Sequence, residues 1–162
     1  MFRLPHIATA LALSGALALL SLPAAASDLP SQPVLTLAAA QQILTAAQTQ
    51  AQKAGWPCVI AVVDSAGLPI LLARMDNAAV PAGVELAPGK ARTAALFRRP
   101  SGALEDAVNG TRPAVITAQG FVLMRGGFPI IINGHTVGAV GVSADTPQHD
   151  EEIAQAGLAA FK

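Results

Sequence analysis

Apolar and polar residues follow a helical period in the segment that begins near residue 36. Small and apolar residues recur every three or four positions on one face, and glutamine and lysine occupy the opposite face. Thr36 precedes the segment as a candidate N-cap, and Gly55 follows it as a candidate left-handed residue that ends a helix. The pattern predicts an amphipathic helix over 37–54 whose alanine-rich side packs closely on another element.

A change of period marks the next elements. Residues 58–63 form a continuous apolar run rich in β-branched side chains, which is typical of a strand that is covered on both faces. The polar stretch 64–67 ends in glycine and leads into a second apolar segment at 68–74. This arrangement predicts a β-hairpin.

A second hairpin is predicted near the end of the chain. Asn133 and Gly134 separate the apolar segments 128–132 and 136–143, and this dipeptide suits a two-residue turn that requires positive φ. Two residues of the later segment lack side chains and leave a thin surface for a backbone, a helix or a flat ligand: Gly138 and Gly141.

The middle of the chain is less regular. Residues 81–97 return to helical patterning, and Pro88 leaves open whether they form one helix or two. Ser101 is placed to cap a short helix over 103–108. The apolar stretches within 113–124 are long enough for a short strand, and the sequence does not decide between one strand, two strands and loop.

The final helix has clear start signals. Thr146 is a candidate N-cap, Pro147 occupies the first helical position, and three carboxylates follow where the helix dipole favours them. The resulting order is α-β-β-α-α-β-β-β-α, with one strand counted in 114–124. It predicts a single-domain α/β (α+β) sandwich with a largely antiparallel five-stranded sheet flanked by helices.

The N-terminus has the pattern of an export signal. Arg3 precedes an apolar run that ends in small residues at 24–26, so we expect a signal peptide over 1–26, a tether over 27–34 and one domain over 35–162. Periplasmic or secreted localisation follows, and no later segment is apolar over enough residues to span a membrane.

Charge and cysteine content exclude some classes of function. Without Arg3 the mature chain has nine Lys and Arg against ten Asp and Glu, so it lacks the basic field of a nucleic-acid-binding protein. Cys58 is the only cysteine, which excludes an intramolecular disulfide and covalent c-type haem attachment.

Motifs for catalysis are weak. The segment Gly141 to Asp145 approaches the nucleophile elbow, but Asp145 replaces its last glycine and no oxyanion loop accompanies it. His149 and Glu152 lie three positions apart on the final helix and are candidate metal ligands, although the sequence shows no third ligand. The other histidine of the mature chain, His135, follows the predicted hairpin turn and is expected at an exposed tip.

Several blocks together carry a family resemblance. They are Ile60 to Gly67, Arg74-Met75-Asp76, Gly89 to Gly102, and Gly126 to Asp145 with the acidic helix after it. In this order they resemble the GlcG/HbpS family of small haem-binding proteins, which is itself similar to the C-terminal domain of a corrinoid adenosyltransferase. The resemblance covers most of 35–161. It implies an α/β sandwich and a homo-oligomer, since family members form rings or stacks often described as octamers.

The resemblance implies non-covalent haem as the cofactor. Haem requires an apolar slot, cations for its propionates and a donor for its iron. Lys90 and Arg92 are the candidate propionate ligands, and Phe97 is a candidate for the slot. The Arg-Pro-Thr block of the family reads Arg-Pro-Ser here, so Ser101 keeps a hydroxyl that serves either the ligand or the helix cap. His149 is the candidate iron ligand.

The sequence therefore predicts an exported protein that binds haem or a related tetrapyrrole reversibly, for storage, delivery or redox sensing. A corrin ligand stays open. So do two other classes: an enzyme or accessory protein that acts on a small metabolite in glycolate or alcohol oxidation, and a structural or partner-binding module. We expect a binding protein rather than an enzyme.

Overall fold

The structure is a computed structural model that describes residues 31–161. The predicted signal segment 1–26 and the first four residues of the predicted tether lie outside these described residues. Residues 31–34 are exposed and belong to no helix or strand. In the described part, no helix is both long and apolar enough to cross a bilayer.

Four strands form one antiparallel sheet in the order β2-β1-β4-β3. They are β1 (Val59–Asp64), β2 (Pro69–Arg74), β3 (Gly127–Ile132) and β4 (His135–Ser143). Both predicted hairpins are present. Asn133 and Gly134 take φ values of 49° and 78° in the second turn, as the sequence predicted.

The fifth strand of the prediction is absent from the described residues. The segment that was assigned to it instead begins with the short 3-10 helix η1 (Pro113–Thr117). Pro113 favours this turn because its ring fixes a helical φ. Further along, the backbone N–H of Val122 donates to Thr93 Oγ1 at 3.0 Å, so this residue bonds to a helix where a strand would bond to a neighbouring strand.

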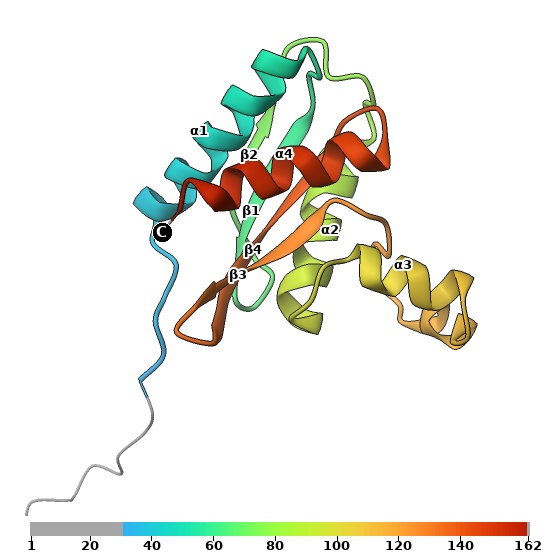
Figure 1. The fold of residues 1–162 in the computed structure, drawn as a ribbon. Coiled ribbons are helices and arrows are strands. Elements are labelled where there is room, and N and C mark those ends of the chain that lie inside the picture. The colour runs from blue at the N-terminus through green and yellow to red at the C-terminus, as the bar shows by residue number, and fades with distance from the viewer. Residues whose placement is uncertain (1–30, 162) are drawn as a thin grey trace, which may run out of the picture. The chain divides into compact units, whose positions relative to one another are not determined.

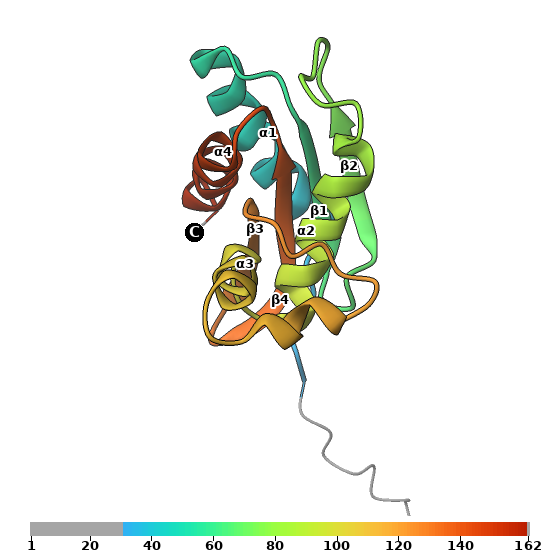
Figure 2. The same ribbon diagram turned by 90° about the vertical axis from the view of Figure 1, so that its right-hand side faces the viewer.

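Helices cover both faces of the sheet. Helices α1 (Leu37–Ala54) and α4 (Pro147–Ala159) pack together on one face, and α2 (Gly83–Phe97) lies on the other (Figures 1 and 2). The fourth helix, α3 (Gly102–Asn109), follows α2. This layering confirms the predicted α/β sandwich.

The interior explains the uninterrupted apolar run of β1. Ile60 and Val62 join the core beneath α1 and α4, while Val63 packs with alanines of α2. The strand is therefore buried on both faces, as its sequence predicted.

The predicted helix boundaries hold at both N-caps. Thr36 Oγ1 accepts from the Ala39 N–H and Thr146 Oγ1 accepts from the His149 N–H, each at 3.2 Å. Gly55 ends α1 with φ 74°. Helix α2 runs without a break through Pro88, so the region is one helix.

Ser101 does not cap α3 with its side chain, and that prediction was wrong. Its backbone is already helical, and its buried hydroxyl donates to Met124 O at 2.6 Å and accepts from Gly127 N at 2.9 Å. These two backbone groups lie where the chain enters edge strand β3. The Ser101 hydroxyl is the hydrogen-bond partner of both groups, so it bonds to them and does not cap the helix.

Helix α2 fills the thin surface that glycine leaves on β4. A Cβ atom added at Gly141 would overlap Ala87 O and lie 2.6 Å from the Ala91 backbone nitrogen. Glycine is needed here because two backbones approach each other, so no flat ligand occupies this surface.

An ion pair lies between α2 and α4. Lys90 Nζ is 2.5 Å from Asp150 Oδ2 and donates to Val142 O at 3.0 Å, and both side chains are almost fully buried. The Ala144 N–H donates to the other carboxylate oxygen of Asp150. Burial raises the pKa of Asp150, while the bonds from Lys90 and Ala144 oppose that rise.

Gly141→Ala tests the close contact of α2 with the sheet. We expect it to lower the free energy of unfolding by about 3 kcal/mol or more, because overpacking against a backbone has no rotamer that relieves it. Gly120→Ala is the matched control, since its methyl group meets open space and only the left-handed backbone costs energy, about 1 kcal/mol. Urea denaturation measures both. Equal losses would contradict the prediction.

Lys90→Met tests the buried ion pair. The variant leaves the Asp150 carboxylate without its partner, which costs about 3–5 kcal/mol at neutral pH. Because the pKa of Asp150 then rises further above its unfolded value, the loss should be smallest at acid pH, should grow as the pH rises from the unfolded to the folded pKa of Asp150, and should be constant above it.

The double variant Lys90→Met/Asp150→Leu is the control for this test. It removes both charges and should be more stable at neutral pH than Lys90→Met. Denaturation curves at several pH values measure the difference. A double variant that is less stable than the single variant at every pH would show that the pair does not act in this way.

Candidate functional site

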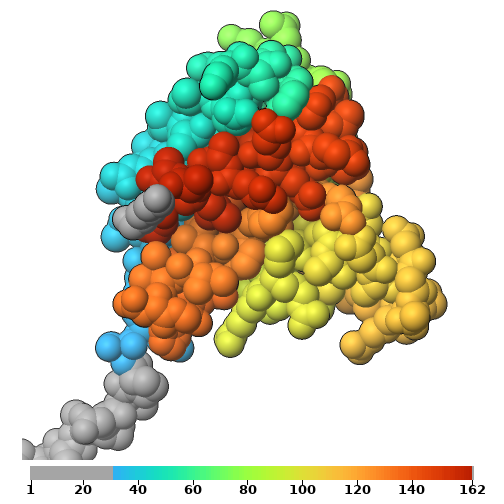
Figure 3. Space-filling model, viewed as in Figure 1, coloured from blue at the N-terminus to red at the C-terminus, as the bar shows by residue number. Residues whose placement is uncertain are grey.

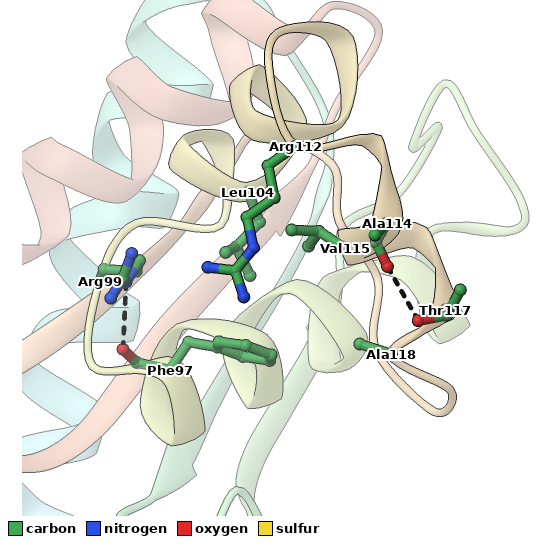
Figure 4. Close-up of a pocket in the computed structure, with 8 residues that line it drawn as sticks. All are labelled: Phe97, Arg99, Leu104, Arg112, Ala114, Val115, Thr117 and Ala118. Atoms are coloured by element: carbon green, nitrogen blue, oxygen red, sulfur yellow. Dashed lines mark hydrogen bonds between the residues drawn. The ribbon is translucent and has the colours of Figure 1, made fainter.

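A cavity of about 440 Å³ lies between the C-terminal end of α2 and the segment formed by α3 and η1 (Figure 4). The space-filling view shows this segment standing apart from the end of α2 (Figure 3). We call the hollow the arginine cavity. It is lined by Phe97, Arg99, Leu104, Arg112, Ala114, Val115, Thr117 and Ala118.

The local sequence forces the chain to turn at this place. Arg98 ends α2 in a left-handed conformation with φ 53°, and Pro100 cannot continue the helix. After this turn the chain continues as α3 and then folds back through η1. Phe97 and Arg99 therefore form one wall, and the residues of α3 and η1 form the other (Figure 4).

A salt-bridge network fixes the α3 side of the cavity. Arg125, in the loop before β3, lies 3.2 Å from Glu151 of α4 and also bonds to Asp106 of α3. Its backbone N–H donates to Glu105 at 2.7 Å. The three carboxylates hold α3 against the body of the domain.

Aromatic residues support the wall formed by α2. The ring of Phe97 packs edge-on against Phe121 with centroids 4.9 Å apart, and the guanidinium of Arg92 lies 5.8 Å from the centroid of the same Phe121 ring. Both contacts are of kinds that stabilise aromatic side chains. Phe97 thus has a supported position at the edge of the cavity.

The cavity combines positive charge with apolar walls. Arg99 and Arg112 are exposed, and among residues 31–161 neither forms a salt bridge. Arg112 extends from the turn after α3 towards Phe97 (Figure 4). None of the described residues that line the cavity is acidic. Such a site suits an anion with an apolar body, because a guanidinium binds carboxylates in a bidentate manner.

The five residues predicted to bind a cofactor are spread over different places. Phe97 lines the cavity, and Arg92 lies behind it against Phe121. Lys90 is in the interior with Asp150, and the hydroxyl of Ser101 is buried against backbone groups. Their contact with a ligand stays a prediction, and only Phe97 faces the cavity.

His149, the fifth of these residues, is outside the cavity lining. Its ring stacks on Trp56 with centroids 3.6 Å apart, and its Nδ1 is 2.7 Å from Asp145 Oδ1. This hydrogen bond is the main cause that lowers the pKa of Asp145. These contacts fix the orientation of the imidazole. Iron ligation by His149 stays a prediction.

The predicted metal pair does not gain a third ligand. Glu152 accepts a hydrogen bond from Gln50 Nε2 at 2.8 Å. In the described part of the chain, no group of three or more His, Cys, Asp or Glu side chains is arranged to hold a metal ion. Metal binding by His149 and Glu152 therefore has no further support from their surroundings. His135 is exposed beside the β3–β4 turn, as predicted.

Sequence reasoning missed most of the cavity. Arg112, Leu104, Val115 and Thr117 come from a short helix, a turn and a 3-10 helix, where no period connects the residues that share a face. The one local signal was Arg112 directly before Pro113, in a segment without an acidic residue.

Comparison with known proteins gives consistent matches. Protein GlcG of Escherichia coli strain K12 is 39% identical over 110 residues, which cover 68% of this chain and 81% of GlcG. A crystal structure of an HbpS double mutant from Streptomyces reticuli has a TM-score of 0.79 at 30% identity, covering 87% of this chain and 96% of that one. The crystal structure of a PduOC:heme complex has a TM-score of 0.73 at 28% identity, covering 80% and 96%.

The family is established by the extent of these matches. Residues 35–159 match the family described as haem degrading protein HbpS-like, and this range contains every helix and strand of the described domain. The match agrees with the resemblance carried by the sequence blocks, and the chain belongs to the HbpS-like family.

Proposed function

We propose that this protein binds haem, or a related tetrapyrrole, non-covalently and reversibly in the arginine cavity. The observation that carries the proposal is the pair of guanidinium groups, Arg99 and Arg112, at an apolar cavity without an acidic residue. Its volume is within the range of about 300–1,000 Å³ that is typical of small-molecule sites.

The lining residues fit two of the three needs of a haem site. Phe97, Leu104 and Val115 offer an apolar surface to the ring, and the two arginines offer partners to the propionates. Covalent attachment of the c type is excluded, because Cys58 is the only cysteine of the chain and no Cys-x-x-Cys-His motif occurs. The third need, a donor to the iron, is not met by the lining residues.

The relatives support a link with haem. The matched family is named for haem degradation, and PduOC was crystallised as a heme complex. Storage, delivery, redox sensing and degradation of haem all require a binding step. Binding is the step that the geometry of this chain supports.

The proposal extends to export and self-association. The composition of residues 1–26 is typical of a signal peptide, and this supports export to the periplasm or out of the cell. Strand β2 is at an edge of the sheet, and Leu68 directly before it and Leu72 within it are both more than half exposed. An apolar sheet edge of this kind favours contact with a second copy of the chain.

Haemin titration tests the cavity. Arg99→Ala and Arg112→Ala should each weaken haemin binding by about tenfold, because each removes one charge-assisted contact with a propionate. Absorption in the Soret region measures the dissociation constant. Arg74→Ala is the matched control, since Arg74 is exposed on β2 and does not line the cavity.

Two results would contradict the proposal. Arginine variants that bind haemin as tightly as Arg74→Ala would show that the ligand lies elsewhere. Haemin spectra that never show a saturable change would remove haem binding altogether, and turnover of a small metabolite or capture of an exported partner would then become the leading alternatives.

One preparation tests export and assembly. When the full-length chain is expressed in a bacterium, the protein in the periplasmic fraction should begin at Ser27, and N-terminal sequencing reads this directly. Its native mass from light scattering should be at least twice the mass of one mature chain. An intact Met1 in the cytoplasmic fraction would contradict export, and a monomeric mass would contradict self-association.

A further inference from the structure

We infer that the arginine cavity selects its ligand by the carboxylates and the flat apolar ring, and that the iron of haem does not contribute to the affinity. Metal-free porphyrins that carry two carboxylates then bind this site as tightly as haem does. The inference rests on the proposed function and narrows it to a chemical class: porphyrin dicarboxylates, whatever metal they hold.

The first step is the set of donor atoms in the cavity wall. Its eight residues carry guanidinium, phenyl, aliphatic and hydroxyl groups, and none carries an imidazole, thiolate, thioether, phenol or carboxylate. Those missing groups are the ones that ligate haem iron in proteins. The single hydroxyl, that of Thr117, already donates to Ala114 O at 2.8 Å within η1.

The second step is the position of the strong donors in the described residues. The ring of His149 is held between Trp56 and Asp145, and His135 is beside the β3–β4 turn at the far end of β4. The thiol of Cys58 is buried and bonds to Met75 Sδ. None of these side chains lines the cavity.

The third step is the charge of the two arginines. A guanidinium stays protonated at every relevant pH and forms planar, paired hydrogen bonds with a carboxylate. Arg99 comes from the turn after α2 and Arg112 from the turn after α3, so the two guanidinium groups enter the cavity from different segments and can hold separate carboxylates (Figure 4). Neither contact depends on the metal at the centre of the ring.

The experiment compares four ligands of one shape with the purified protein. They are haemin, zinc protoporphyrin, metal-free protoporphyrin IX and the dimethyl ester of protoporphyrin IX, titrated by absorption and by porphyrin fluorescence. We expect dissociation constants for the first three within about threefold of one another, and a constant at least about tenfold higher for the ester. The double variant Arg99→Ala/Arg112→Ala should weaken the first three alike.

The outcomes separate this inference from the proposed function. Haemin bound more than about thirtyfold tighter than metal-free protoporphyrin would overturn the inference while haem binding stands. His149→Ala and His135→Ala, titrated in parallel, would then identify the iron ligand by loss of that advantage. An ester bound as tightly as the free acid would overturn the role of the carboxylates. Absence of binding by all four ligands would remove the proposed function itself.

Discussion

The approach of helix α2 to the sheet is the constraint on which the rest of the fold depends. Gly141 and Gly127 face the backbone of α2 so closely that any side chain would overlap it. The buried pair of Lys90 and Asp150 then connects α2 to α4 across the end of β4. These contacts fix the depth and direction of α2. They therefore also fix the position in space of its C-terminal end, and the cavity begins there.

Local rules predicted the elements that depend on local geometry. Thr36 and Thr146 cap their helices, and the Asn133-Gly134 turn sets the register of its hairpin, because each acts within a few residues. The same local rules did not predict the structure of segment 113–124. Its structure depends on contacts with α2, such as that of Val122 with Thr93, which are distant in sequence.

The candidate site shows the same limit more sharply. Lys90, Arg92 and Arg99 lie within ten residues of one another in the sequence, and we predicted that Lys90 and Arg92 both bind propionates. In the structure Lys90 points into the interior, Arg92 lies against Phe121, and only Arg99 lines the cavity. A helix followed by a tight turn distributes neighbouring charges over different faces, so sequence proximity alone could not identify the binding residues. Arg112 joins Arg99 only because the chain folds back.

The stack of Trp56 on His149 gives the protein an internal optical probe. Trp56 is the only tryptophan of the chain, so all indole emission comes from a ring that faces an imidazole at 3.6 Å. The emission therefore reports on the contact between Trp56 and the first turn of α4, at a place separate from the arginine cavity, and it needs no added label.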